Sequence, residues 1–583
     1  MSAIQQLITE HMDIWTAADT TKRSGRGRAS GNAGSIYGVK KLRELILELA
    51  VRGKLVPQDA NDEPASELLK RIQAEKAKLI SESKIKKDKP LAPIGEDEKP
   101  FDLPQSWEWT RLQEVYDVRD GTHDTPKYQD SGFPLVTSKN LYSGTLDFSD
   151  IKYISKDDHL KIKDRSGVDK GDILFAMIGS IGNPVIVDTD IEFSIKNVAL
   201  FKPYSGQLSD TSYLLKYLIM AAINLREEAA GAVQSFVSLG VIRSYLMPIP
   251  PLAEQHRIVA KVDELMALCD QLEAQHSNAA EAHEKLVSHL LGMLTQSQST
   301  DDFNANWQRI AAHFDTLFTT EASIDALKQT LLQLAVMGKL VPQNTNDEPA
   351  SELLKRITAE KAKLIAEGKI KKDKTLAPIG EDDKPFELPQ GWEWVKLGVI
   401  TQKLTDGSHN PPSDAGSGLP MLSSQNVNLG KIDFNSPSRF VTEEDFIIEN
   451  SRTKIEANDV LLTIVGSLGR SAVVPANAPK FVLQRSVAVI KTELFSEFLC
   501  LQLSSPYCAN YFDLHGKGTA QKGIYLGQLS EMPTVVPSIA EQHRIVAKVD
   551  ELMALCDQLK TRIQQANQQQ QAIANVLVAQ VLK

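Results

Sequence analysis

Apolar residues in this 583-residue chain recur with helical spacing in a segment that is written twice. The twenty residues AEQHRIVAKVDELMALCDQL run from 253 to 272 and return unchanged from 540 to 559. Their apolar positions step by 4, 3, 4 and 3, which predicts a long helix with a heptad seam. The seam residues are Ile258, Val262, Leu265, Cys269 and Leu272, and Ile545, Val549, Leu552, Cys556 and Leu559. In the second copy we expect the seam to continue through Ile563, Ala566, Ile573 and Leu577.

A helix of about 40 residues would span about 60 Å, which is long for one globular domain and suits a rod. Shorter helices are predicted upstream of each copy. Val39, Leu42, Ile46 and Leu49 step by 3, 4 and 3, and Ile324, Leu327, Leu331 and Leu334 repeat the pattern. Gly53 and Gly338 follow where a C-terminal cap glycine belongs. The segments 64–80 and 349–365 are further predicted helices.

The segments 105–250 and 390–537 have a different pattern, with short apolar runs bounded by glycine and polar residues. Strands are predicted in GDILFAMIGSIG (171–182) and NDVLLTIVGSLG (458–469), in FPLVTSKN (133–140) and LPMLSSQN (419–426), and in NVALFK (197–202) and SVAVIK (486–491). Residues 212–229 form one amphipathic helix pattern. Each segment is therefore predicted to be a compact α+β domain.

The repeat extends well beyond twenty residues. GKLVPQ, NDEPASELLKRI, KIKKDK, LAPIGED and WEW all recur at an offset of 285. We predict an α+β protein with internal pseudo-two-fold duplication, in which two globular domains are separated by long antiparallel coiled-coil helices. The expected parts are an N-terminal extension (1–38), a first helical region (39–104), a first variable domain (105–250), a central helical region (251–389), a second variable domain (390–537) and a C-terminal helix (538–583).

Composition changes this picture only slightly. Apolar content is 42%, charged content is 24% and the net charge is −10, a balance that argues mildly against a stand-alone nucleic-acid binder. We expect a cytoplasmic protein, because no apolar run is long enough for a membrane span and the N-terminus lacks a signal-peptide pattern. Cys269 and Cys556 are predicted to be buried free thiols. The Gly/Ser-rich, basic stretch 20–36 is interpreted as a flexible linker, with a phosphate-contacting arm as the alternative.

Candidate catalytic motifs are weak. HNPPS (409–413) resembles the amino-group pocket of adenine methyltransferases, but Ser413 replaces the aromatic residue and no glycine-rich cofactor loop precedes it. A phosphate-binding loop and Cys/His clusters with metal spacing are also missing, so we expect no bound metal or cofactor in this chain. His256 and His543 are interpreted as capping or packing residues. The sequence therefore favours a non-catalytic protein.

Several of these features together resemble the specificity (S) subunit of type I restriction–modification enzymes. They are the paired segments PPLAEQHRIVAKVDELMALCDQL and PSIAEQHRIVAKVDELMALCDQL, the domain openings SWEWTRLQEV and GWEWVKLGVI, the glycine-flanked strands, and the loops GAVQ and GTAQ. The resemblance covers nearly all of the chain except about residues 1–38.

This resemblance implies two target recognition domains that each read one half of a bipartite, asymmetric double-stranded DNA site. It also implies docking to two methyltransferase (M) subunits and, in the full complex, two restriction (R) subunits. S-adenosylmethionine, Mg²⁺ and ATP would belong to those partners. Because the chain is acidic, we expect the isolated subunit to bind DNA weakly, with its partners supplying much of the phosphate contact.

Base reading requires Arg or Lys for guanine and Asn or Gln for adenine, placed in loops at strand ends. Candidates in the first domain are Thr122, His123, Lys139, Asn140, Tyr142, Lys196, Asn197 and Gln234. Candidates in the second domain are Ser408, His409, Gln425, Asn426, Gln484, Arg485, Lys517, Gln521 and Lys522. Asp120 and Asp406 are interpreted as closing the neighbouring DG turns, since phosphate repels carboxylates.

Two other classes of function remain open at this stage. A protein-interaction scaffold with two domains on a helical bar and no DNA role is compatible with the acidic composition. A single-chain methyltransferase is disfavoured by the missing cofactor loop.

Overall fold

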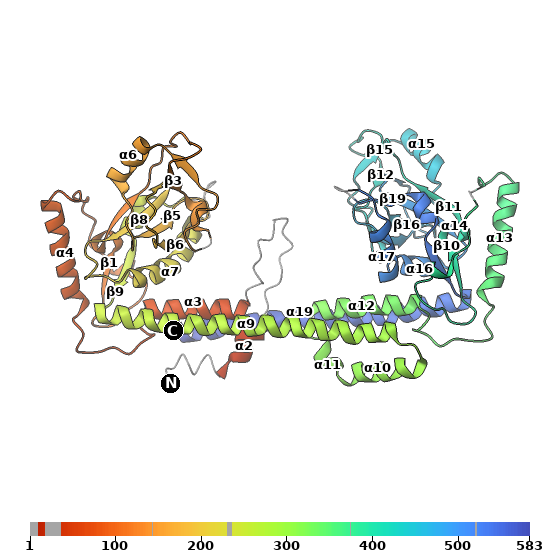
Figure 1. The fold of residues 1–583 in the computed structure, drawn as a ribbon, viewed down its shortest axis with the longest axis horizontal. Coiled ribbons are helices and arrows are strands. Elements are labelled where there is room, and N and C mark those ends of the chain that lie inside the picture. Colours follow the sequence, from red (N-terminus) through yellow and green to blue (C-terminus); the bar gives the residue numbers. More distant parts are fainter. Residues whose placement is uncertain are drawn as a thin grey trace. The chain divides into compact units, whose positions relative to one another are not determined.

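The computed structural model describes residues 10–17, 36–142, 144–229, 236–372, 375–518 and 522–582. The chain divides into two compact units, one made of Met1–Ala279 with Ala566–Lys583 and the other of Ala280–Gln565. Each unit contains a helical frame and one of the variable domains (Figure 1). Gln234, Gln521 and residues 20–35 of the predicted linker lie outside the described residues.

The frame of the first unit is built from α2 (Met12–Ala17), α3 (Tyr37–Val51), α4 (Ala65–Ser81), the start of α9 (Leu252–Gln296) and the end of α19 (Ile539–Leu582). Arg43 of α3 forms ion pairs with Asp270 at 2.6 Å and Glu273 at 2.9 Å on α9. Tyr37 Oη donates to Asn575 Oδ1 on α19 at 2.9 Å. The helix α3 therefore packs against both long helices in this unit.

The second unit repeats this frame with the two long helices exchanged. Its helices are α10 (Thr300–Ala312), α11 (Phe314–Leu317), α12 (Glu321–Val336), α13 (Ala350–Ala366), the end of α9 and the start of α19. On α12, Asp325 pairs with Lys560 of α19 at 2.8 Å. Lys339, just after α12, donates to the Ser297 carbonyl just after α9 at 2.8 Å. The predicted frame helices are thus confirmed in both copies, including long helices of 45 and 44 residues.

The predicted seam is confirmed over the repeated twenty residues and, beyond them, at Ile563 and Leu577, but it is wrong at Ala566 and Ile573. All ten seam positions belong to buried or partly buried apolar clusters of their own unit. Ala566 is exposed and Ile573 is 46% exposed, whereas Ala574 is fully buried and Leu577 packs beside it. A straight helix drifts relative to a strict heptad. From residue 566 the helix also packs within the first unit, against α3, so a different face is buried.

The described part of the first domain contains three sheets. Antiparallel β1 (Glu108–Arg111) and β9 (Leu246–Ile249) lie where the domain joins the frame. A four-stranded sheet has the order β2 (Tyr116–Asp120), β8 (Val198–Pro203), β5 (Ile173–Ala176), β6 (Gly182–Ile186). A three-stranded sheet has the order β4 (Lys152–Ile154), β3 (Phe133–Val136), β7 (Ser194–Ile195). The helical elements are η1 (Glu96–Glu98), α5 (Leu112–Val115), η2 (Ser138–Leu141), α6 (Lys156–Ser166), α7 (Thr211–Ala229) and α8 (Leu239–Ser244).

The second domain has the same sheets. They are β10 (Glu393–Lys396) with β20 (Pro533–Val536), then β11 (Thr401–Asp406), β19 (Val487–Thr492), β16 (Val460–Thr463), β17 (Ser471–Val473), and β15 (Arg439–Val441), β12 (Leu419–Leu422), β18 (Val482–Leu483). It adds the pair β13 (Val427–Asn428) and β14 (Lys431–Ile432). Its helical elements are η3 (Glu381–Asp383), α14 (Leu397–Ile400), α15 (Glu443–Thr453), α16 (Ser496–Leu503), α17 (Pro506–His515) and α18 (Leu526–Ser530).

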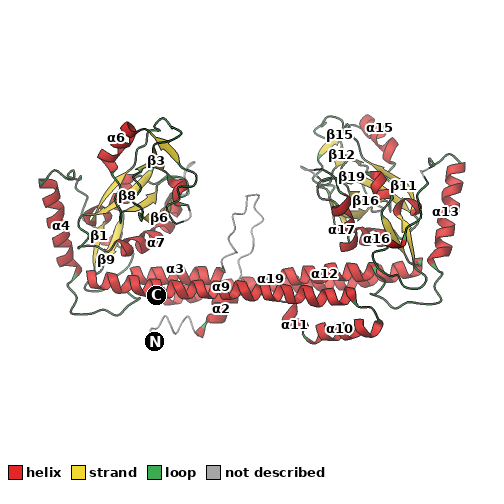
Figure 2. Ribbon diagram, in the orientation of Figure 1, coloured by secondary structure: helices red, strands yellow, loops and turns green. Residues whose placement is uncertain are grey.

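The central strand β5 of the four-stranded sheet is buried on both faces, so it is continuously apolar. Along β5, Ile173 and Phe175 belong to one core cluster and Leu174 and Ala176 to the other, as the two-residue period of a strand requires. The predicted α+β class is confirmed, and strands gather in the variable domains while the frame is helical (Figure 2). The predicted strand 171–182 is shorter than expected, because residues 177–181 leave the sheet as a loop.

The short segments that the two repeats share meet at one point in each unit, which we call the anchor node. Its residues are Gln58, Asp62, Trp107, Glu254 and Arg257 in the first unit, and Gln343, Asp347, Trp392, Glu541 and Arg544 in the second. The Trp107 indole donates to buried Glu254 at 2.9 Å, and Gln58 donates to its other oxygen at 2.6 Å. The second node repeats both distances on Glu541. Each node thus fastens a variable domain to the start of a long helix.

Candidate nucleic-acid interface

Four loops that are far apart in sequence lie side by side in the first domain, joined by backbone hydrogen bonds. The Asn197 amide donates to the Thr122 carbonyl at 3.2 Å, and the Met177 amide donates to the Asn197 carbonyl at 3.4 Å. The Val237 amide then donates to the Met177 carbonyl at 2.9 Å. We call these loops (121–125, 177–181, 196–197 and 236–238), together with residues 137–142 after β3, the first loop face.

The second domain holds its loops in the same way. The Arg485 amide donates to the Ser408 carbonyl, the Ile464 amide to the Ser486 carbonyl, and the Ile524 amide to the Ile464 carbonyl, each at 2.9 Å. The second loop face comprises residues 407–410, 423–428, 464–468, 484–486 and 522–524. Both faces thus have one backbone arrangement, which gathers most of the described residues that the sequence nominated for DNA reading.

Each loop face begins with a clamp around a buried carboxylate. In the first domain, Asp120 Oδ2 lies 2.9 Å from His123 Nε2, and Arg165 donates to Asp120 Oδ1. In the second, Asp406 Oδ2 lies 2.8 Å from His409 Nε2, and Arg452 donates to Asp406 Oδ1. We call these triads the carboxylate clamps. The aspartates therefore close the DG turns through a histidine ring and also hold an arginine from α6 or α15.

The two faces differ beside the clamps. Lys196 pairs by a β-bridge with Thr122, and Gln484 occupies the equivalent place beside Ser408. Lys196 Nζ donates to Thr125, whereas Gln484 Nε2 donates to Ser438 Oγ at 3.0 Å. Asn197 makes two backbone hydrogen bonds in the first domain. In the second domain Arg485 makes one of them and Ser486 makes the other, so the second domain has one additional residue here. Arg485 is exposed. These neighbouring positions therefore present different side chains on the same backbone.

Three of the nominated side chains are committed to internal contacts. Asn140 and Asn426 are buried, and their side-chain oxygens accept from the amides of Thr137 and Ser423 at 2.9 Å. Their amide groups donate to the Asp147, Asp433 and Ser436 carbonyls at 3.0, 3.2 and 2.7 Å. Ser408 is buried and its hydroxyl donates to Glu449 at 3.0 Å. In this conformation these side chains hold the loops, and their nomination as base readers stays a prediction.

The remaining described nominees reach the surface. His123, Lys139, Tyr142, His409, Gln425, Arg485, Lys517 and Lys522 are exposed, and Thr122, Lys196, Asn197 and Gln484 are half-buried. Lys517 lies beside the second loop face, where it pairs with Gly523. Which of these side chains contact bases stays a prediction. Arg165 and Arg452 were not among the sequence candidates, although their positions differ by 287, the offset that separates the identical twenty-residue segments.

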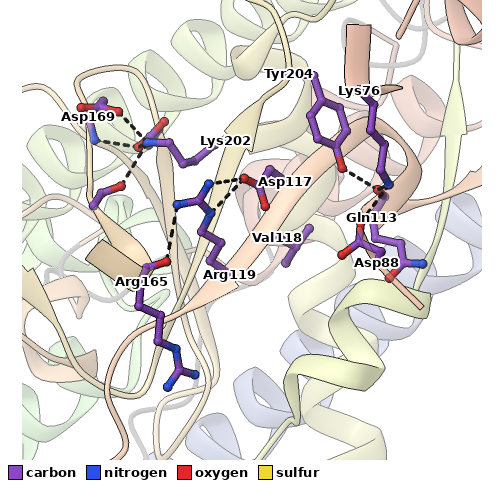
Figure 3. Close-up of polar contacts among 12 residues, drawn as sticks. Lys76, Asp88, Gln113, Asp117, Val118, Arg119, Arg165, Asp169, Lys202 and Tyr204 are labelled. Carbon is purple, nitrogen blue, oxygen red and sulfur yellow. Dashed lines mark hydrogen bonds and ion pairs between the residues drawn. The ribbon is translucent and has the colours of Figure 1, made fainter. Parts of the chain in front are cut away.

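A polar network in the first domain joins β2, β8 and the end of α6 (Figure 3). Lys202 of β8 pairs with Asp169 at 2.8 Å and with buried Asp172, and burial raises the pKa of Asp172 although Lys202 opposes that rise. Arg119 bonds Asp117 and donates to the Arg165 carbonyl at 3.4 Å, while the Arg165 side chain extends away from this network. The network thus fixes the end of α6 and leaves the Arg165 guanidinium for the clamp.

The same figure shows how the arm after α4 is attached to the domain. Tyr204 Oη and Lys76 Nζ both donate to the Gln113 carbonyl, at 2.9 and 2.8 Å, and Lys76 also pairs with Asp88 at 2.9 Å (Figure 3). In the second unit, Lys361 donates to the Gly398 carbonyl at 2.7 Å. The two arms are thus held by equivalent lysines.

The other candidate residues have structural surroundings. His256 Nδ1 lies 2.8 Å from Asp210, and the His543 ring lies 3.9 Å from that of Phe495, so both contact the neighbouring domain. The four cysteines are free and buried, as predicted for Cys269 and Cys556. Among the described residues, no three or more His, Cys, Asp or Glu side chains are grouped so that they could hold a metal ion. Over the same residues, no helix is both long and apolar enough to span a membrane.

Comparison with known proteins places these features in one family. The family described as "Type I restriction modification DNA specificity domain" matches residues 104–282 and 391–568. The EcoAI type I restriction enzyme specificity subunit of Escherichia coli is 42% identical, and the EcoEI subunit from the same species is 40% identical. Each alignment covers 99% of this chain and 99% of the relative.

A crystal structure of an HsdS subunit from Thermoanaerobacter tengcongensis is 18% identical and has a TM-score of 0.35, over 83% of this chain and 98% of that one. The family assignment itself rests on the full-length relatives and on the two matched domains. The chain therefore belongs to the family of type I restriction enzyme specificity subunits, with two copies of the family's DNA specificity domain.

Proposed function

We propose that the two domains read different halves of one bipartite, asymmetric site in double-stranded DNA, and that the chain has no catalytic role of its own. The observation that carries this proposal is the pairing of one loop backbone with different side chains. Lys196 and Asn197 occupy in the first domain the place that Gln484, Arg485 and Ser486 occupy in the second. Lysine, arginine, asparagine and glutamine are the side chains that distinguish guanine from adenine in the major groove.

We further propose that the repeated frame docks two like methyltransferase subunits, and through them two restriction subunits. The identical twenty residues include outward positions that the helix seam does not require. Leu268 and Leu555, which are equivalent, are 38% and 49% exposed. Identity at such positions is expected where two copies of one partner bind. S-adenosylmethionine, Mg²⁺ and ATP would then be held by those partners.

The two alternative functions are less well supported. Family membership does not favour a scaffold without a DNA role. The HNPPS segment gives no support to a single-chain methyltransferase. Arg439 donates to the Pro412 carbonyl at 2.7 Å, and Asp414 accepts from the Phe440 amide at 2.9 Å. That segment is therefore held as an ordinary turn against β15.

The proposal is tested by reconstituting the full chain with its methyltransferase subunits and sequencing the sites methylated in a random DNA library. We expect two short sequence blocks at a fixed separation. Gln484→Ala with Arg485→Ala should relax one block, and Lys196→Ala the other, each by about 1–3 kcal/mol of discrimination. Asn197 is left unchanged because its φ of 54° would strain a replacement. Methylation without sequence preference, or a motif that neither variant alters, would contradict the proposal.

A further inference from the structure

The carboxylate clamps are the part of the loop faces that does not differ between the domains. Both use the same residue types and the same atoms, with the histidine three positions after the aspartate and the arginine on the following helix. Asp120 and Asp406 are 5% and 7% exposed, so each is a fixed acceptor beneath the surface. The clamp side chains of Arg165 and Arg452 are 56% and 48% exposed, and those of His123 and His409 are 53% and 52% exposed.

This geometry orients the arginine side chain and leaves most of its hydrogen-bond donors available. A guanidinium has five N–H donors in a rigid fork, and each clamp aspartate takes one contact from a single terminal nitrogen. The other donors remain toward solvent at the edge of the loop face. Because the aspartate fixes the guanidinium, little side-chain entropy remains to be lost when a ligand is bound. Such a group suits a planar, bidentate acceptor such as phosphate.

Two domains that read different bases cannot obtain that difference from identical groups. The DNA backbone, in contrast, presents the same phosphates at every sequence, and contacts to it position a protein without specifying a base. We propose, on the basis of the proposed function, that the carboxylate clamps bind backbone phosphates of DNA through Arg165 and Arg452. The differing residues beside them are then brought to the base edges in a fixed register.

The charges around the clamps predict that the two contacts are unequal. In the first domain Lys196 lies across the bridge from Thr122, two residues after the clamp aspartate, and adds positive charge. In the second, Gln484 replaces it, and Glu449 on α15 bonds the Ser408 hydroxyl beside the clamp. Repulsion between Glu449 and a phosphate weakens that contact. Arg165 should therefore contribute more to phosphate binding than Arg452.

The test measures DNA affinity of the full chain, assembled with its methyltransferase subunits, between 50 and 200 mM salt. Arg165→Gln should lower the magnitude of the slope of log affinity against log salt by about 0.9, the value for one phosphate contact. The loss of affinity across this fourfold salt range should shrink by about threefold. The methylated motif should not change, and Arg165→Lys should restore most of the slope. Arg452→Gln should give a smaller effect in the same direction.

Lys163→Gln is the matched control, because it removes one positive charge from the same helix. Lys163 pairs with Glu192 at 2.9 Å and lies two residues before Arg165, on another side of α6. The control should leave the slope unchanged. Thermal unfolding of each variant shows whether a change in affinity reflects a loosened loop.

Three outcomes would overturn the proposal. An unchanged salt slope in Arg165→Gln would make the clamp a structural tie only. An altered motif at one half-site would make Arg165 a base reader, and loss of methyltransferase binding with an intact slope would make it a protein contact. If the unmodified complex itself shows no bipartite motif, the proposed function fails. If it shows one and the slope does not move, only the clamp assignment fails.

Discussion

The anchor nodes and the loop faces are both duplicated, but they have been preserved in different ways. In the nodes the side chains are the same and so are the distances, 2.9 Å from tryptophan and 2.6 Å from glutamine to the central glutamate in each unit. In the loop faces the backbone hydrogen bonds are the same, while the exposed side chains differ. One region repeats all of its chemistry, whereas the other repeats its backbone and its carboxylate clamps but not the exposed side chains beside them.

Burial explains the difference. Glu254, Trp107 and their equivalents are nearly inaccessible, so replacing any of them leaves a buried polar atom without its partner or a cavity. The loop faces are held by backbone groups that any residue supplies, so their outward side chains can change at little cost to folding. Diverged recognition is therefore compatible with a frame that stays fixed.

The strongest way to break this comparison is to remove a node tryptophan. Trp392→Ala should cost about 3–5 kcal/mol, because the indole is buried and its N–H satisfies Glu541. Hydrogen exchange should accelerate first in β10 and β20, the strands beside the node. Trp107→Ala should act equally on β1 and β9.

Two control variants sharpen this expectation. Trp392→Phe keeps most of the volume and loses the N–H, so it should cost about 1–3 kcal/mol. Trp307→Ala, at a site that is 39% exposed on α10, should change stability by less than about 0.5 kcal/mol. A loss at Trp307 as large as that at Trp392 would contradict the role assigned to the node.

Within the loop face, the comparison narrows to two adjacent residues. Asn426→Ala removes the side chain that bonds Ser423, Asp433 and Ser436, and should cost about 1–3 kcal/mol and expose residues 423–436 to proteolysis. Gln425→Ala, at an exposed position, should leave stability within about 0.5 kcal/mol and relax the motif at one half-site. Equal stability of the two variants would show that Asn426 is not the loop's support.

Sequence patterns predicted the frame well because helical periodicity and exact repetition are local signals. They were less successful where one continuous apolar run is a strand in its first part and a loop in its second. In GDILFAMIGSIG the strand ends at Ala176, and Met177 is fixed in the loop face by Asn197 and Val237, which come from distant parts of the chain. Apolar composition alone cannot distinguish a buried strand from a buried loop that continues it.

The candidate site was predicted by residue type and by position in strand-end loops, and neither criterion includes the contacts that a side chain makes in the fold. Asparagine was nominated as an adenine reader. In the structure, however, each asparagine side chain accepts a hydrogen bond from the backbone amide three residues before it, Asn140 from Thr137 and Asn426 from Ser423. That spacing is visible in the sequence. Arg165 and Arg452 were not predicted because they lie on helices, whereas base-reading residues were expected in loops at strand ends. The anchor nodes could not be predicted either, because their central contacts join residues that are far apart in the sequence. The tryptophan and the glutamate are 147 positions apart in the first node and 149 in the second, and no local pattern shows such a contact.

The smallest expected effect concerns the charge inside the two nodes. Burial raises the pKa of Glu254 and of Glu541 above the ordinary value of 4.5, against the opposing hydrogen bonds from tryptophan and glutamine. An acid whose pKa rises on folding binds protons more tightly in the folded state. Its stabilising contribution is full below the ordinary pKa and is lost as pH rises through the raised value. Glu254→Gln and Glu541→Gln should each remove part of that decline.

The two glutamine variants should behave alike, although one neighbour differs. In each variant the node glutamine, Gln58 or Gln343, turns its amide so that its carbonyl accepts from the new side chain. At the first node the Ser106 hydroxyl, which donates to Gln58 Oε1 at 3.1 Å, can accept from the turned amide instead. Urea unfolding followed by tryptophan fluorescence, from pH 4.5 to 7.5, should give both variants a flatter pH profile than the unmodified chain. A profile as steep as that of the unmodified chain in both variants would show that neither glutamate titrates with folding.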